Sequence, residues 1–204
     1  FDTGAFQAIY GYNATSSKWT IWNAITGAGS KIAPAQGFFV KSKTGGGTVS
    51  FTPAMRTIGT SDDFIVGRAS SDVQVVLAKL LMSKGSDTYH TDIYFNSNAT
   101  RNLDPGYDAG AFTGASNNIF THLVEGNTGI DMAIQALAYS DFNDVVVPLG
   151  INAGAGEQFS IALDDSATTL PDNIEVYLED SLTGSFTLLN TSDHIATPTT
   201  DING

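Results

Sequence analysis

The sequence predicts an all-β protein, an antiparallel β-sandwich of the jelly-roll kind that forms either one unit or two packed β subdomains. Three observations predict it. Apolar residues recur with period two far more often than with the helical period of about 3.6. Turn residues interrupt these runs at short intervals, and no amphipathic helix of normal length stands out. With 204 residues and 42% hydrophobic content, the chain can bury a core.

Two hairpins are predicted near the N-terminal end. Residues 7–12 and 18–25 are aromatic-rich runs on either side of a short polar loop, which suits a hairpin connection. Residues 37–43 and 48–52 flank a triple-glycine turn, where glycines supply the positive φ that tight turns need. We therefore expect two adjacent antiparallel pairs.

The middle of the chain predicts the central strands. Residues 73–82 form a long apolar run whose β-branched start favours a central strand, although 77–82 alone could equally be helical. Residues 88–95 follow after a short polar turn and are expected to pair with it. Further strands are expected over 119–125, 132–137, 145–151 and 158–163.

The C-terminal end predicts one more hairpin. Ile174, Val176 and Leu178 alternate with polar residues, so one face of this strand is apolar. Residues 181–184 then form a turn, and residues 186–189 continue as the second strand.

A polar stretch separates the first hairpins from the remaining strands. We expect residues 59–71 to connect two parts, 1–58 and 72–204. The first part would be the C-terminal portion of a β domain, and the second a β-sandwich of its own.

Charge and composition exclude several classes of partner. Nine Lys and Arg stand against 21 Asp and Glu, so the formal charge is 9 − 21 = −12, which would repel nucleic acid and anionic membrane surfaces. No apolar run approaches the ~20 residues of a membrane span. Charged residues make up only 15% of the chain, and cysteine is absent. Such hydroxyl-rich, thiol-free β chains are common among extracellular bacterial proteins.

Several segments together resemble a known family. They are Ile-Ala-Pro-Ala-Gln-Gly-Phe-Phe-Val-Lys at 32–41, Val-Ser-Phe-Thr-Pro-Ala-Met-Arg at 49–56, Phe-Asn-Ser-Asn-Ala-Thr-Arg-Asn-Leu-Asp-Pro-Gly-Tyr-Asp-Ala at 95–109, Val-Pro-Leu-Gly at 147–150 and Leu-Glu-Asp-Ser-Leu-Thr-Gly at 178–184. They resemble the β-rich region preceding the type IX secretion C-terminal sorting domain in large secreted Bacteroidetes surface proteins, namely adhesins and polysaccharide-degrading enzymes. Leu103 stands where Phe is usual in the third motif.

The resemblance implies an architecture and a location. It implies a module at the outer cell surface or outside the cell, whose partners are the other domains of the same polypeptide. It also implies that an N-terminal segment and a last strand lie outside residues 1–204. Catalysis in such proteins resides in other domains, so the resemblance assigns no active-site residues here.

The sequence offers little for catalysis. His90, His122 and His194 are the only candidates for a base of the usual kind at neutral pH. None lies in a nucleophile elbow, a metalloprotease helix or a phosphate-binding loop. We expect surface or strand histidines and no enzyme.

One acidic loop could hold a calcium ion. Asp104 and Asp108 lie four residues apart around a Pro-Gly turn, and the amides of Asn96, Asn98 and Asn102 are near in sequence. Carboxylate and amide oxygens are ligands that Ca²⁺ prefers. The alternative is a loop in which these aspartates accept hydrogen bonds from backbone N–H groups.

Four aromatic residues of the first hairpin are candidates for carbohydrate binding. Tyr10 and Tyr12 share one strand face, whereas Trp19 and Trp22 are three apart and point to opposite faces unless a bulge intervenes. Sugar rings stack on exposed aromatic surfaces. The alternative is that these side chains pack within the hairpin.

Three functions follow from these features. The first is a non-catalytic structural or adhesive module of a larger extracellular protein. The second is a carbohydrate-binding module attached to a polysaccharide-degrading enzyme. An independent enzyme is the weakest, because no residues converge on a mechanism.

Overall fold

The computed structural model describes residues 2, 4–13, 18–27, 30–32, 36–57, 75–112 and 118–204. The regular structure of these residues is β-strand, apart from single turns of 3₁₀-helix at Pro53–Met55 and Tyr139–Asp141. None of them forms a helix long and apolar enough to cross a membrane. The predicted all-β class is therefore confirmed.

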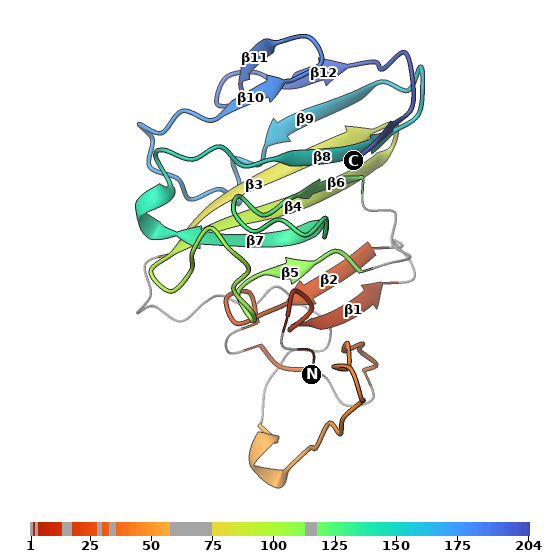
Figure 1. The fold of residues 1–204 in the computed structure, drawn as a ribbon, viewed down its shortest axis with the longest axis vertical. Coiled ribbons are helices and arrows are strands. Elements are labelled where there is room, and N and C mark those ends of the chain that lie inside the picture. Colours follow the sequence, from red (N-terminus) through yellow and green to blue (C-terminus); the bar gives the residue numbers. More distant parts are fainter. Residues whose placement is uncertain are drawn as a thin grey trace.

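The strands form one large sheet and two small ones (Figure 1). β1 and β2 make the first small sheet, and β10 and β11 make the second. In the large sheet the order is β12-β9-β3-β4-β7-β6-β8-β13, and β5 also pairs with β7. The strand bounds are β1 Ile9–Asn13, β2 Lys18–Trp22, β3 Val75–Lys84, β4 Asp87–Asn96, β5 Ala109–Gly110, β6 Ile119–Thr121, β7 Met132–Ala138, β8 Leu149–Ala153, β9 Phe159–Leu163, β10 Tyr177–Asp180, β11 Ser185–Leu188, β12 His194–Ala196 and β13 Ile202–Asn203.

The β3–β4 hairpin is the centre of the large sheet. Its ten paired positions run from Val75 opposite Asn96 to Lys84 opposite Asp87, and Gly85 turns the chain with φ +59°. Buried and partly buried residues alternate along β3. That period of two resolves the helix-or-strand ambiguity of residues 77–82 in favour of a strand.

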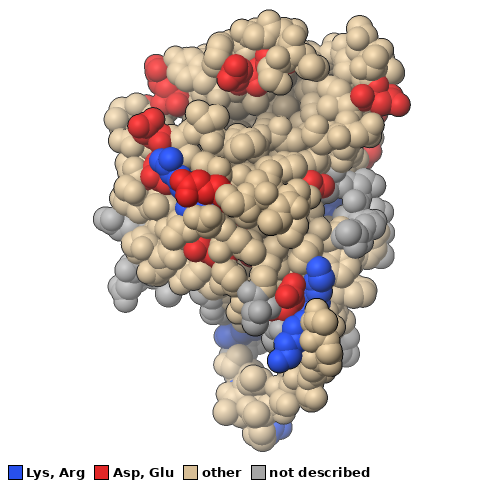
Figure 2. Space-filling view, in the orientation of Figure 1, with Lys and Arg blue, Asp and Glu red and all other residues tan. Residues whose placement is uncertain are grey.

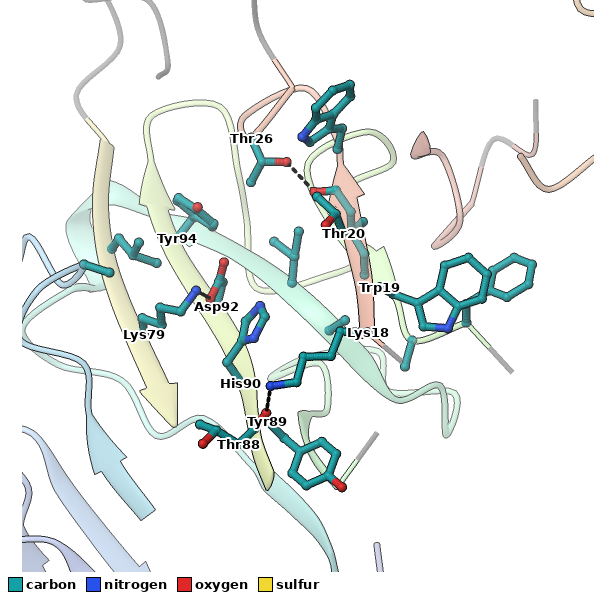
Figure 3. A pocket seen from close by; sticks show the side chains of 18 residues that line it. Lys18, Trp19, Thr20, Thr26, Lys79, Thr88, Tyr89, His90, Asp92 and Tyr94 are labelled. Carbon is teal, nitrogen blue, oxygen red and sulfur yellow. Dashed lines mark hydrogen bonds and ion pairs between the residues drawn. The ribbon is translucent and has the colours of Figure 1, made fainter. Parts of the chain in front are cut away.

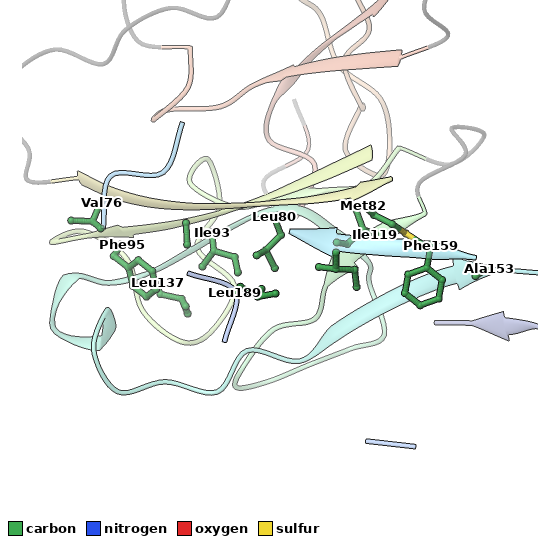
Figure 4. Close-up of a cluster of buried hydrophobic side chains, with 12 residues drawn as sticks. Val76, Leu80, Met82, Ile93, Phe95, Ile119, Leu137, Ala153, Phe159 and Leu189 are labelled. Atoms are coloured by element: carbon green, nitrogen blue, oxygen red, sulfur yellow. The ribbon is translucent and has the colours of Figure 1, made fainter. Parts of the chain in front are cut away.

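The main core lies on one face of this hairpin (Figure 4). β3 contributes Val76, Ala78, Leu80 and Met82, which point to the same side because strand side chains alternate. The sheet curls, so side chains of β8, β9 and the C-terminal hairpin region close over this face, as expected for a sandwich-like fold. The remaining buried members are Ile93, Phe95, Ile119, Leu137, Ala153, Phe159, Ile161 and Leu189.

One strand pair differs from the antiparallel prediction. β4 and β7 are parallel, with Asp92 opposite Ile134 and Asn96 opposite Ala138. Parallel neighbours need a long connection. Residues 97–131 supply it, and they carry β5 and β6 on the way.

The second predicted hairpin does not form. Residues 36–57 contain a turn and one 3₁₀ turn, and only Phe39 makes a ladder bridge, to Tyr10 of β1. The two halves still fold back, since the rings of Phe38 and Phe51 lie 6.2 Å apart. Gly45 and Gly46 both have positive φ, which turns the chain but leaves no strand register. Elsewhere β6 ends at Thr121 and β8 begins at Leu149, so both are shorter or later than predicted.

The small β1–β2 sheet packs on the face of the large sheet opposite the main core. Tyr10 and Ala8 are buried against Ala109 and Ile134. Ile25, which follows β2, is buried against Ala99 and Ala136. The N-terminal part thus packs directly on the strands of the second part, while the predicted connecting segment 59–71 lies outside the described residues.

Candidate functional site

A cavity of about 270 Å³ lies between β2 and the outer face of β3, β4 and β7 (Figure 3). It is lined mainly by apolar and aromatic side chains, with a few ionisable ones. Its lining comprises Lys18, Trp19, Thr20, Ile21, Trp22, Thr26, Leu77, Lys79, Thr88, Tyr89, His90, Asp92, Tyr94, Ala111, Phe112, Ala133, Ile134 and Ala167.

Strand alternation places the polar groups on the floor of the cavity. His90, Asp92 and Tyr94 occupy every second position of β4, so they share the face that points away from the main core. On the neighbouring strand Lys79 lies directly opposite Asp92, and Leu77 lies opposite Tyr94. The intervening residues of both strands fill the core instead.

The β1–β2 sheet covers the cavity and is held at both ends. The Lys18 Nζ donates a hydrogen bond of 2.5 Å to the Thr88 carbonyl of β4. The Tyr10 hydroxyl donates one of 3.2 Å to the Gly110 carbonyl of β5. The ring of Trp19 lies 5.1 Å from that of Phe112. These contacts give the cavity a fixed wall on the β2 side.

Opposite charges meet inside the cavity. Lys79 Nζ lies 3.3 Å from Asp92 Oδ1, and these side chains are only 21% and 12% exposed. Partial burial strengthens this attraction relative to a surface pair. The cavity therefore presents a cation and a carboxylate side by side.

The pKa of the His90 imidazole is lowered, first because surrounding protein atoms displace water and then because Lys79 lies nearby, although the side chain keeps exposed surface. The lowered pKa favours the neutral form. A neutral imidazole donates a hydrogen bond from one ring nitrogen and accepts at the other. His90 can thus pair with a hydroxyl in either sense.

The four predicted aromatic residues come to occupy different environments. Tyr10, Tyr12 and Trp19 lie together, with ring centroids of Trp19 at 6.5 Å from Tyr10 and 5.0 Å from Tyr12. Tyr10 is fully buried and Trp22 is 5% exposed, whereas Tyr12 is 48% exposed. The register of β1 and β2 is continuous, so Trp19 and Trp22 do point to opposite faces. Packing among neighbouring aromatic rings prevails over an open platform. Of the four residues, Trp19 and Trp22 are the two that belong to the lining of the cavity.

The predicted calcium loop satisfies its aspartates internally. Asp108 accepts hydrogen bonds of 2.6 Å from the backbone N–H groups of Asp104 and Ala136. Asp104 accepts one of 2.5 Å from the Thr100 backbone N–H and is also bonded to the Thr100 hydroxyl. Among the described residues, no group of three or more His, Cys, Asp and Glu is placed to hold a metal ion. This arrangement matches the alternative in which both carboxylates bind the backbone.

The other two histidines lie away from the cavity. His122 Nε2 lies 3.5 Å from Asp131 Oδ1 and its Nδ1 lies 3.2 Å from Asn127 Nδ2. His194 Nδ1 lies 3.1 Å from the hydroxyl of Thr187. Only His90 shares a cavity with a carboxylate, and in the described part of the chain Asp92 is paired with Lys79 and no hydrogen bond joins it to His90.

The polar residues on the floor of the cavity were not predicted as a site from the sequence. Lys79, His90 and Asp92 lie within two strands whose other charged residues, Lys84 and Asp87, are at the turn that joins the strands. The signal was the polar alternation of Thr88, His90 and Asp92 in a strand expected to be central. Polar residues at alternate positions indicate a face that is turned away from the core. That the β1–β2 sheet covers this face and makes it the floor of a cavity could not be predicted from the strand alone.

Comparison with known proteins gives one match. No curated protein and no solved structure matches the chain. A family model matches residues 2–201, which is nearly the whole chain and includes the β1–β2 sheet and the strands β3, β4 and β7 that form the cavity. The chain therefore belongs to the family described as a domain of unknown function, DUF8693.

Proposed function

We propose that the chain is a non-catalytic, extracellular adhesive module of a larger secreted or cell-surface protein, and that it binds a sugar unit of a polysaccharide or surface glycan in the cavity beneath β2. The observation that carries this proposal is the composition of the cavity. Aromatic residues are among those that line it, and Lys79, Asp92 and His90 lie together on its floor.

The chemistry of these groups suits a sugar. A pyranose ring offers an apolar C–H face to an aromatic wall and hydroxyls that both donate and accept hydrogen bonds. Lys79 donates, Asp92 accepts, and neutral His90 does either. Ligand pockets are typically apolar with a few placed polar groups, and drug-sized ligands occupy roughly 300–1,000 Å³. A cavity of about 270 Å³ therefore suits one ring of a longer chain.

The same groups do not suit hydrolysis. A glycosidase needs two carboxylates that face each other across the bond to be cleaved. Asp92 is the one carboxylate in the lining of this cavity, and its Oδ1 is held by Lys79. Binding without turnover is the function that these residues support.

Retention on insoluble polysaccharides and binding to a glycan array test the proposal. We expect at least one glycan to bind, and we expect Trp19→Ala and Lys79→Met each to weaken its binding at least tenfold. Val146→Ser is the matched control, because Val146 is 82% exposed and lies outside the cavity. Folding of each variant is checked by circular dichroism.

Two outcomes would count against this site. The first is that Tyr12→Ala loses binding while Lys79→Met retains it. The glycan would then bind at the exposed edge of the β1–β2 sheet, where Tyr12 lies, and not in the cavity. Failure to bind any glycan would leave the structural role alone, as a spacer between neighbouring domains.

A further inference from the structure

The charge of the chain is divided unevenly along its length. Five of the nine Lys and Arg residues and one of the 21 acidic residues precede position 62. The net charge is thus 5 − 1 = +4 there and 4 − 20 = −16 in the remainder, which together give −12. Figure 2 shows basic side chains gathered on the projecting lower part, whereas acidic side chains lie mainly on the body above it.

The projecting part is residues 36–57, here called the arm (Figure 1). Its root is anchored, because Lys41 Nζ lies 3.5 Å from the centroid of the Phe6 ring and Phe39 pairs with Tyr10. Beyond the root, Phe51 is 72% and Met55 65% exposed. Arg56 and Lys43 are exposed on the same segment. The arm therefore presents apolar side chains together with positive charge.

The opposite end of the molecule presents apolar side chains together with negative charge. The β10–β11 hairpin lies at the far end of the long axis from the arm (Figure 1). Phe186 is 65% exposed and stands directly opposite Glu179, and Tyr177 on the same strand face is 56% exposed. Glu175 and Glu179 are exposed beside them. Exposed apolar clusters of this kind mark interaction surfaces.

We propose that the arm of one copy docks on the outer face of the β10–β11 hairpin of a second copy, head to tail. The two surfaces are complementary in charge and both expose aromatic rings, while arm against arm or hairpin against hairpin would bring like charges together. Because the arm and the β10–β11 hairpin lie at opposite ends of the molecule, the arm of one copy cannot dock on the hairpin of the same copy. Such a heterologous contact builds rings or open chains of several modules, depending on the rotation between copies, rather than a two-fold dimer.

Sedimentation velocity over a range of concentrations tests the contact. The native chain should form a concentration-dependent ladder of species larger than a dimer, weakened by high salt because screening reduces the charge attraction. The arm variant Lys43→Glu/Phe51→Ser and the hairpin variant Tyr177→Ser/Phe186→Ser should each be monomeric alone. Val146→Ser, an exposed apolar residue outside both surfaces, should associate as the native chain does.

Mixing the two variants gives the sharpest result. The arm variant keeps a native hairpin and the hairpin variant keeps a native arm, so an equimolar mixture should form a 1:1 complex and nothing larger. A native chain that stays monomeric at every concentration overturns the proposal. So does association that persists in the hairpin variant alone, because that would place arm against arm, and so does a mixture that stays monomeric.

Discussion

At the scale of single residues, Asp108 is the most unusual side chain in the molecule. It is fully buried, yet both of its oxygens accept hydrogen bonds from backbone N–H groups of Ala136 and Asp104. Burial disfavours the charged form and the hydrogen bonds favour it; burial prevails and raises the pKa of this carboxyl to about 7. The residue therefore titrates near neutral pH rather than near 4.

This shift makes stability depend on pH in a defined direction. A folded-state pKa above the unfolded value means that the stabilisation from the neutral carboxyl is complete below about pH 4 and is lost as pH rises through about 7. The loss is at most about 4.5 kcal/mol, at about 1.4 kcal/mol per pKa unit.

We predict that the unfolding free energy of the native chain, relative to Asp108→Asn, falls between pH 5 and pH 8. The variant carries no titrating group at this position, so the difference isolates Asp108. Urea unfolding at several pH values measures it. A difference that stays constant or grows over this range would contradict the burial argument.

Some contacts of individual site residues could be predicted from the sequence and others could not. The opposite directions of Trp19 and Trp22 followed from strand alternation, and the continuous register of β1 and β2 places them on opposite faces. The burial of Tyr10 did not follow, because its neighbours Ala109 and Ile134 come from strands far along the chain. Likewise, Lys79 and Asp92 become opposite partners only through the β3–β4 register.

At the scale of elements, local pattern was sufficient where a strand pairs with its sequence neighbour. The β3–β4 and β10–β11 hairpins were predicted from alternation and turn residues. The parallel β4–β7 pair was not, because nothing local distinguishes a parallel from an antiparallel neighbour. The arm was misassigned as a hairpin because its apolar residues suggest a strand, although in the structure Phe51 and Met55 are exposed.

The β6–β8 pair offers a test of packing between elements. Gly150 of β8 stands opposite Phe120 of β6, whose ring is 1% exposed. A Cβ at Gly150 would lie 2.2 Å from Phe120 Cε2, far inside van der Waals contact. This close approach explains why the Val-Pro-Leu-Gly segment ends in glycine.

We expect Gly150→Ala to destabilise the protein by about 1–3 kcal/mol, because the buried ring must shift to admit a methyl group. Gly154→Ala is the matched control, since the nearest atom to its Cβ would be Glu157 Oε2 at 3.5 Å. Thermal unfolding of both variants measures the difference. Equal midpoints for the two would mean that the β6–β8 contact is looser than described.

At the scale of the whole molecule, the two faces of the curled sheet have different roles. One face of β3 and β4 forms the main core, and the other face forms the floor of a cavity covered by the β1–β2 sheet. Segments that are distant in sequence, including residues 18–22, 77–79, 88–94, 111–112 and 133–134, meet there. That meeting could not be predicted locally, since it depends on where the first sheet packs on the second.

The central claim is that a glycan binds in the cavity beneath β2. The indole N–H signal of Trp19 tests it most directly. In a two-dimensional nitrogen–proton spectrum, the signal of Trp19, assigned with Trp19→Phe, should shift or broaden on titration with a glycan that binds, because Trp19 is among the residues that line the cavity. In Lys79→Met, which retains Trp19 but loses a polar partner on the cavity floor, the same shift should require at least tenfold more glycan. A bound glycan that leaves the Trp19 signal unchanged would contradict the account.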